Sequence, residues 1–385
     1  MKYKNYYLSF PPNNPKLLIP NLSLSAQSDS FMLYAPGSKA GKILKKIGMA
    51  AARIGIFKII GCFGSVLPDS LIIPQTIKPI ICNEILELLR QDWEAALNVK
   101  QINFAISLGT PDFFQKITAL IFDQDNKILS IAKIGCTPQA RKLILHEYST
   151  LKHIQAISLQ KCIVPLAIGC GTSGPATWML QTVITGGTSS PDILKNGHLS
   201  FLSELAKITQ VTAPLSSISF WEQIKKSIST TYPNKNTTLL KEKQFFTTLI
   251  NKADETIVSA ENMSWPLVSA HGDFTPWNIR MIDGKKIAIY DWEYFINTAP
   301  AGWDIIRFIF MVEHLLKKRS FAAIYSYFIT DKFYHDTINQ WEKITGIYIP
   351  DRQLLVQLFL LDLYYKANLT MKSNNHRDKK NAVSK

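Results

Sequence analysis

The sequence predicts an α+β protein with two lobes, and three observations support this. Between residues 102 and 133, apolar and polar residues alternate with period two in three short runs, which is typical of a small antiparallel sheet. After about residue 185 the apolar spacing becomes that of a helix, which indicates a mainly helical second half. The chain has 385 residues, too many for one small module.

The elements are expected in a simple order. Helical spacing covers residues 81–98, and the three period-two runs that follow are predicted strands. Thr137 and Pro138 match an N-cap and a proline in the first helical turn, so a helix begins there. Later, residues 279–290 form a predicted hairpin in which Asp283-Gly284 is the favoured two-residue turn. The predicted strands cover residues 102–109, 116–122 and 128–133.

These elements divide the chain into four parts. Residues 1–80 are an accessory segment with a basic amphipathic helix, and residues 81–184 form an N-lobe of antiparallel sheet plus helix. Residues 185–370 form a mostly helical C-lobe, and residues 371–385 a flexible basic tail.

Composition excludes several classes of protein. Hydrophobic residues make up 46% and charged residues 19%, which excludes a mainly disordered or collagen-like chain. The five cysteines are odd in number and include no Cys-x-x-Cys pair, so they indicate neither a disulfide framework nor a zinc site. No segment approaches the roughly 18 apolar residues of a spanning helix, and the N-terminus lacks a signal-peptide pattern. We expect a globular protein of the cytoplasm.

The net charge of +14 is concentrated at the two ends of the chain. Residues 39–58 interleave lysines with isoleucines at helical spacing. This helix is interpreted in two ways: it lies on an anionic membrane at the inner face, or it packs on the body of the protein with a solvated basic face. A nucleic-acid partner is not expected, because no aromatic-basic recognition motif accompanies the charge.

The strongest chemical signal is His271-Gly-Asp273-Phe-Thr-Pro-Trp-Asn278, followed by Asp291 in IYDWE. With a two-residue turn at Asp283-Gly284, Asn278 faces Ile289, and Asp291 is its diagonal neighbour on the same face. One amide and one carboxylate suit Mg²⁺, which binds substrate phosphates with its remaining positions. Asp273 would lie beside the metal and accept the proton of an attacking hydroxyl, as phosphoryl transfer requires. His271 is expected to orient this loop.

A second pair of residues is expected to bind the nucleotide. Lys133 shares strand parity with Leu129 and Ile131, so its ammonium emerges on an apolar face. Glu147 falls on the apolar stripe of the next helix. Burying either charge alone would cost free energy, so Lys133 and Glu147 are predicted to pair. The pair would hold the ammonium of Lys133 toward phosphate oxygens. An inert buried salt bridge is the alternative.

Two further segments could contact the nucleotide. The turn at Gly109 could cover the phosphates with backbone N–H groups. The segment after the next strand, from Gln181 to Ile184, could link the lobes and bind adenine through its backbone.

These residues resemble the aminoglycoside phosphotransferase and choline kinase-like family, within the protein-kinase-like fold, over roughly residues 100–310. The resemblance implies a catalytic base at Asp273, Mg²⁺ ligands at Asn278 and Asp291, and phosphate binding by Lys133 with its partner Glu147. It also implies that Asp304 braces the catalytic loop, although a helix N-terminus favours an acid there in any case. Residues 1–80 depart from the minimal family pattern.

The leading hypothesis is therefore an ATP- and Mg²⁺-dependent phosphotransferase that moves the γ-phosphate to a hydroxyl of a small molecule, sugar or glycan precursor. The alternative is a catalytically idle kinase-like module that binds or scaffolds at the membrane surface.

Overall fold

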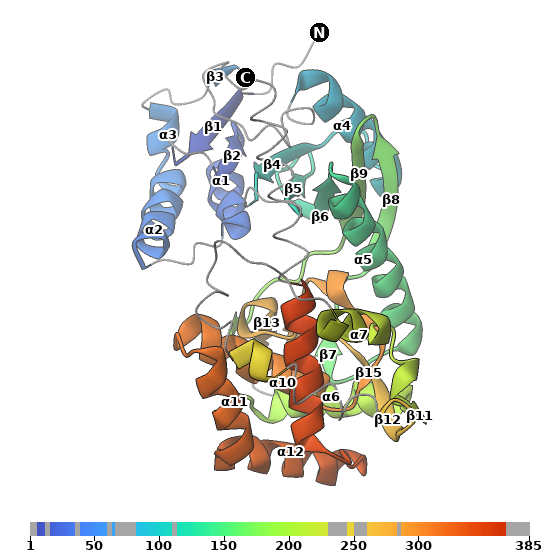
Figure 1. Ribbon diagram of the computed structural model, residues 1–385. Helices are drawn as coiled ribbons and strands as arrows, with labels where there is room; N and C mark the ends of the chain where they lie inside the picture. Colours follow the sequence, from blue (N-terminus) through green and yellow to red (C-terminus); the bar gives the residue numbers. More distant parts are fainter. Residues whose placement is uncertain are drawn as a thin grey trace, which may run out of the picture. The chain divides into compact units, whose positions relative to one another are not determined.

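The computed structural model describes residues 6–11, 16–34, 39–59, 64–65, 82–109, 114–229, 245–249, 260–282 and 286–366. The chain forms two compact units. Unit 1 comprises Met1–Lys152 and Pro165–Ile184, and unit 2 comprises His153–Val164 and Thr185–Lys385. Figure 1 labels the elements of both.

Unit 1 is built on one antiparallel sheet with the strand order β3-β1-β2-β4-β5-β6-β9-β8. The three strands predicted from the period-two runs form its centre, in register from Asn103↔Phe122 and Lys116↔Gly135. The strands are β1 (Tyr6–Phe10), β2 (Leu17–Pro20), β3 (Gly64–Ser65), β4 (Asn103–Ser107), β5 (Lys116–Phe122), β6 (Ile128–Gly135), β8 (Ala167–Ser173) and β9 (Ala176–Gln181).

Two helices flank this sheet at positions that the sequence predicts. Helix α4 (Asn83–Leu97) buries Trp93 edge-on against Phe104 of β4, with ring centroids 5.2 Å apart. Helix α5 (Pro138–Ile157) begins as expected, because Ala140 N–H donates to Thr137 Oγ1 at 3.1 Å. The predicted apolar stripe of α5 is buried in full: Ala140, Ile144, Glu147, Leu151 and Ile154.

The N-terminal residues extend the same sheet, because Leu17 of β2 pairs with Ser107 of β4. The single basic helix predicted over residues 39–58 is two helices, interrupted at Gly55 with a φ of 77°. These helices lie beside β1 and β2 (Figure 1). The elements are α1 (Leu24–Ser30), the 3-10 turn η1 (Phe31–Leu33), α2 (Lys39–Arg53) and α3 (Ile56–Ile59).

Unit 2 is mainly helical and carries two small sheets, with the orders β10-β13-β14-β7 and β11-β12-β15. Its strands are β7 (Cys162–Ile163), β10 (Thr188–Ser189), β11 (Val211–Pro214), β12 (Ser264–Ala270), β13 (Ile279–Met281), β14 (Ile287–Ile289) and β15 (Ile296–Pro300). Its helices and turns are α6 (Asn196–Thr209), η2 (Leu215–Ser217), α7 (Trp221–Ser229), η3 (Pro276–Asn278), η4 (Trp292–Tyr294), α10 (Trp303–Met311), the π-helical η5 (Val312–Leu316), α11 (Phe321–Thr330) and α12 (Lys332–Thr345), followed by helical residues 352–366.

Aromatic side chains fill the core of unit 2. Trp303 of α10 packs against Phe220 and Phe359, with centroids 4.8 and 5.3 Å away. This packing fixes α10, which supplies two residues of the candidate site described below. The predicted α+β class, with an antiparallel N-terminal sheet plus helix and a mostly helical C-terminal part, is confirmed.

The predicted register of the hairpin over residues 279–290 is wrong by one residue. Ile279, not Asn278, lies opposite Ile289, and Ile282 N–H donates to Lys286 O. The connection therefore holds one residue more than a two-residue turn, and such a slip moves every partner along the strand. The turn itself, residues 283–285, lies outside the described residues, as does the predicted tail over residues 371–385.

Within the described parts of the chain, every helix is too short or too polar to cross a bilayer.

Candidate active site

The loop from His271 to Asn278 joins β12 to β13 in unit 2, and its first turn requires a glycine. Gly272 has a φ of 77°, and a Cβ added there would lie 1.9 Å from the carbonyl oxygen of Tyr294. A side chain at this position would thus combine left-handed strain with a backbone clash. The loop ends in the 3-10 turn η3, with Pro276 at its start and Asn278 as its last residue.

Asp304, at the start of α10, holds the backbone of this loop. Its Oδ2 accepts from His271 N–H at 2.6 Å and its Oδ1 from Gly272 N–H at 3.0 Å. Burial raises the pKa of Asp304 to about 7, while these two backbone donors and Arg307 act in the opposite direction. Both carboxylate oxygens are thus used on consecutive peptide groups, which is the geometry of a brace.

His271 is fully buried, and both of its ring nitrogens contact the backbone. Its Nε2 lies 3.0 Å from Tyr290 O, and its Nδ1 accepts from Asp273 N–H at 3.2 Å. These contacts assign the Nε2–H tautomer, because Nδ1 acts as the acceptor. A ring held in this way fixes the backbone immediately before Asp273, as expected of a residue that orients the loop.

The carboxylate of Asp273 is held from two sides. Its Oδ2 accepts from Asn278 Nδ2 at 2.8 Å. Its Oδ1 accepts from Arg307 Nη2 at 2.6 Å and from Arg307 Nε at 3.2 Å. The Asp273 and Arg307 side chains are 14% and 18% exposed, so the pair is largely but not fully buried. Each oxygen of an ionised carboxylate has two acceptor positions, so Asp273 can still accept a further proton donor.

The sequence interpretation did not include Arg307. It lies three residues after Asp304 in GWDIIRF, and three residues place two side chains on one face of a helix. Asp304 and Arg307 therefore contact the same loop from one helix. Asp304 binds the backbone of the loop, and Arg307 binds the side chain of Asp273. The spacing of three residues could have indicated that Arg307 faces the same side of the helix as Asp304. It could not have identified Asp273 as the residue that the guanidinium contacts.

The corrected hairpin register changes how Asn278 and Asp291 come together. Tyr290 N–H donates to Asn278 O at 2.9 Å, so Asn278 faces Tyr290 and Asp291 is the next residue along. Asp291 has left the strand, with φ and ψ of 66° and 59° in the left-handed region. The Nδ2 of Asn278 donates to Asp273, so the Oδ1 of Asn278 is the side-chain acceptor atom of this residue.

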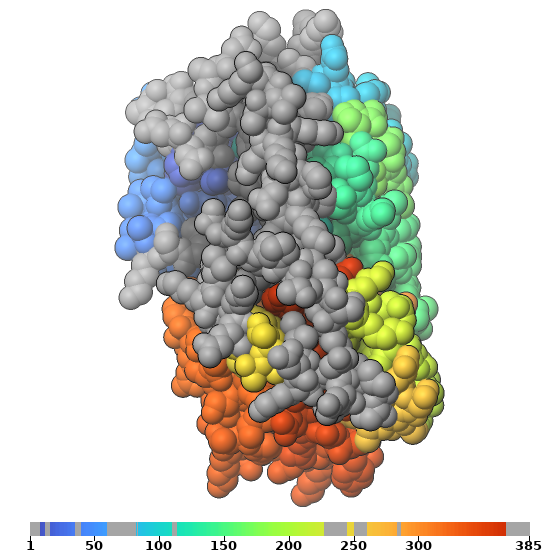
Figure 2. Space-filling model, viewed as in Figure 1, coloured from blue at the N-terminus to red at the C-terminus, as the bar shows by residue number. Residues whose placement is uncertain are grey.

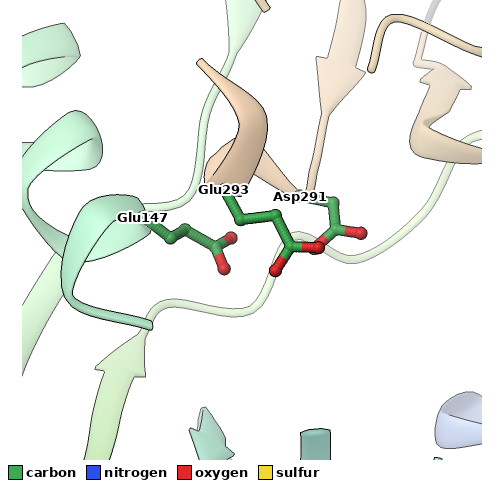
Figure 3. A group of neighbouring side chains, drawn as sticks. All are labelled: Glu147, Asp291 and Glu293. Carbon is green, nitrogen blue, oxygen red and sulfur yellow. The ribbon is translucent and has the colours of Figure 1, made fainter. Parts of the chain in front are cut away.

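Asp291 has a neighbour that the sequence interpretation also missed. Glu293 is 4% exposed in the turn η4, and its carboxylate oxygen lies within 4.8 Å of that of Asp291. Figure 3 shows the two carboxylates side by side. Electrostatics agree with this grouping: burial raises the pKa of the Tyr294 hydroxyl, and Glu293, Asp273 and Asp291 raise it further. Carboxylate and amide oxygens are the donors that Mg²⁺ prefers, so this set fits that ion.

In unit 1, the predicted pair of Lys133 and Glu147 is present. Lys133 Nζ lies 2.6 and 2.7 Å from the two carboxylate oxygens of Glu147, and the side chains are 11% and 1% exposed. Strand β6 supplies the lysine and helix α5 the glutamate, which Figure 3 shows projecting from that helix. The small exposed part of the pair therefore belongs to the side chain of Lys133.

The other predicted nucleotide contacts are also in unit 1. Gly109 has a φ of 67°, and an added Cβ would meet Lys116 O at 2.2 Å, so this turn requires glycine. Residues 110–113 of the loop lie outside the described residues. Gln181 is the last residue of β9, between Ile131 and Ala167 in the sheet. Ile184 is the last residue of unit 1.

Aromatic residues in the loop and beside it include both buried and exposed side chains. Phe274 stacks on Phe201 with centroids 5.5 Å apart, and Trp292 lies 4.6 Å from the His271 ring. Trp277, directly before Asn278, is 47% exposed. It therefore presents a large aromatic surface beside Asn278.

Several solved structures that are similar to this chain are of phosphotransferases and kinases. One is the choline kinase LicA from Streptococcus pneumoniae, at 14% identity over 74% of this chain and 99% of that one, with a TM-score of 0.38. Another is an ethanolamine kinase of Plasmodium vivax, at 15% identity, 74% and 81% coverage and a TM-score of 0.44. A third is the GDP complex of aminoglycoside 2'-phosphotransferase-IIIa, at 11% identity, 78% and 94% coverage and a TM-score of 0.46. No protein-family model and no curated protein sequence matches the chain.

Proposed function

We propose that this protein is an ATP- and Mg²⁺-dependent phosphotransferase that moves the γ-phosphate to a hydroxyl of a small molecule, sugar or glycan precursor. The observation that carries the proposal is the state of Asp273. Its carboxylate is oriented by Asn278 and Arg307 and retains a free acceptor position. A carboxylate held in this way can align an acceptor hydroxyl and take its proton.

The remaining residues have roles that follow from their chemistry. Lys133, held by Glu147, would bind phosphate oxygens of the nucleotide as a fixed positive charge. Asn278 and Asp291 would hold Mg²⁺, with Glu293 as a third oxygen donor beside Asp291. When bound, this ion would neutralise charge on the β- and γ-phosphates. Asp304 and His271 would keep the loop rigid through their backbone contacts.

A pocket in unit 2 supports an acceptor site next to this loop. Phe308 of α10 forms part of its wall and also contacts Phe274, with centroids 5.9 Å apart. The lining is mostly apolar, but it includes Asp192, Glu313 and Lys317. Charges of both signs in an apolar pocket suit a polar acceptor with little net charge better than a polycation.

The test is a screen for acceptor-dependent ADP release, with sugars, glycan precursors, amino alcohols and aminoglycosides as acceptors. We expect turnover with at least one hydroxyl compound, its loss on chelation of Mg²⁺, and its loss in Asp273→Asn. Unchanged turnover in Asp273→Asn would contradict the role of this residue.

One observation favours the second candidate, a catalytically idle kinase-like module for binding or scaffolding. Both oxygens of Asp273 already accept hydrogen bonds from Asn278 and Arg307, so the base is partly satisfied within the protein. Nucleotide binding without ADP release across the whole acceptor screen, in wild type and in Arg307→Met alike, would support this candidate over the phosphotransferase.

A further inference from the structure

Helix α2 in unit 1 has an inner face that packs very closely on the N-terminal elements. Gly48 and Ala52 are buried there, and a Cβ on Gly48 would lie 2.5 Å from Phe31 Cε1. Lys45 Nζ also donates to Tyr34 O at 2.5 Å. Because only small residues allow this approach, the rotation of α2 about its own axis is fixed.

The outer face of α2 carries a stripe of exposed isoleucines. Ile43 and Ile47 of α2 are each 60% exposed, and Ile54, the residue directly after α2, is 67% exposed. Their spacing places them along one side of a helix. Ile59 of α3 continues the exposed apolar surface at 79%. Figure 2 shows α2 and α3 at the molecular surface, in light blue. Large aliphatic side chains this exposed, gathered on one side, mark an interaction surface.

Basic residues accompany this isoleucine stripe. Lys42, Lys46 and Lys58 are exposed, and none forms an ion pair with another described residue. No acidic residue occurs between Asp29 and Asp69. The stripe is therefore bordered by positive charge that the nearby sequence does not neutralise.

Arg53, at the end of α2, is also exposed, but it is excluded from this set because its guanidinium already has partners within the protein. Its Nε donates to Ser28 Oγ at 3.2 Å, and it lowers the pKa of Asp29 against the raising effect of burial. Together with Lys45, it anchors the helix to α1 and η1, and the three exposed lysines remain for a partner. A surface hollow beside the exposed lysines is lined by Lys46, Met49, Ala50, Arg53 and Ile54.

We propose that α2 and α3 bind the surface of an anionic lipid bilayer, with the isoleucine stripe in the head-group region and the three lysines on the lipid phosphates. This is the arrangement of an interfacial amphipathic helix, which lies in the plane of the membrane. A nucleic acid would bind the lysines but would leave the isoleucines in water. It would therefore explain the basic residues of this surface and not the exposed apolar ones.

The experiment is flotation of the full-length protein with vesicles, of phosphatidylcholine alone and of phosphatidylcholine with roughly one third phosphatidylglycerol. The lysine variant is Lys42→Gln with Lys46→Gln and Lys58→Gln. The isoleucine variant is Ile43→Ser with Ile47→Ser and Ile54→Ser. Matched controls remove exposed lysines and exposed large aliphatic residues elsewhere: Lys100→Gln with Lys127→Gln and Lys142→Gln, and Leu88→Ser with Leu145→Ser and Ile208→Ser. Circular dichroism and thermal unfolding show that each variant is folded.

We expect wild type to bind the anionic vesicles and not phosphatidylcholine alone. The lysine variant should bind on the order of 100-fold more weakly, since each lysine near an anionic surface contributes roughly fivefold. The isoleucine variant should also lose most binding, and both controls should bind like wild type. Equal binding to both vesicles, or no binding, would overturn the proposal. So would an isoleucine variant that binds as wild type does, or salt-sensitive binding to duplex DNA or RNA that depends on the lysines alone.

Discussion

Arg307 places two N–H groups on a single oxygen of Asp273, Oδ1, at 2.6 Å from Nη2 and 3.2 Å from Nε. The other oxygen, Oδ2, is contacted by Asn278 at 2.8 Å. The carboxylate is therefore fixed in orientation, with its two oxygens in different environments. Because a proton acceptor must be aligned with the attacking hydroxyl, this relationship leads directly to the first two predictions.

Asp273→Asn should reduce acceptor-dependent ADP release by about 100-fold or more, because the amide cannot take a proton from the hydroxyl. Nucleotide binding, measured by equilibrium titration, should stay close to wild type. A variant that loses nucleotide binding and turnover in equal proportion would instead assign Asp273 to binding.

Arg307→Met should lower kcat on the order of 100-fold, because Asp273 loses the contact that fixes Oδ1. Arg307→Lys should retain more activity, since a lysine can supply one of the two hydrogen bonds. The matched control is Arg352→Met, which removes an arginine that pairs with the buried Glu342 at 2.6 Å in the same unit. Faster turnover in Arg307→Met would show that the arginine restrains Asp273 and does not position it.

Lys133→Met should lower the free energy of unfolding by about 3–5 kcal/mol, because it leaves Glu147 buried without its cation. The double variant Lys133→Met with Glu147→Leu should regain most of this stability, since no buried charge remains. Chemical denaturation measures the free energy of unfolding of each variant. Nucleotide binding should stay weak in both variants, and full binding in the double variant would show that the pair is only structural.

His198 should make stability depend on pH. Burial, with a smaller effect of Lys195, lowers the pKa of His198 from 6.5 to about 4. Between these values the unfolded chain binds a proton that the folded chain does not, so stability is complete above about pH 6.5 and falls as the pH drops toward 4. The loss is roughly 3 kcal/mol. Urea unfolding at several pH values should show a weaker dependence for His198→Asn, whereas exposed His146→Gln should behave as wild type does.

Gly272→Ala should destabilise the protein more than Gly186→Ala. Both glycines have positive φ, 77° and 83°, so each substitution carries a left-handed strain of about 1–2 kcal/mol. Only at Gly272 would the new Cβ meet backbone, the Tyr294 oxygen at 1.9 Å, whereas nothing lies within 4 Å at Gly186. Thermal unfolding of the two variants compares them directly, and equal shifts would mean that the loop at Gly272 can move aside.

Local patterns predicted a large part of this protein correctly. The parity of Lys133 on its strand and the place of Glu147 on its helix stripe were enough to predict the buried pair, because each depends only on the period of its own element. The N-cap at Thr137 was also predicted correctly, because a cap depends only on the residue types at the start of its helix. The hairpin register failed because it depends on the length of a connection, and one extra residue shifts every partner.

The sequence by itself determined the α+β class, the central strands, and the loop that carries His271, Asp273 and Asn278, because each is written in local periodicity or in a contiguous motif. Only the tertiary structure decided that Arg307 meets Asp273, that Glu293 lies beside Asp291, and which face of α2 remains exposed. These relationships join residues through packing, and packing depends on how whole elements approach one another. No pattern along the chain contains that information.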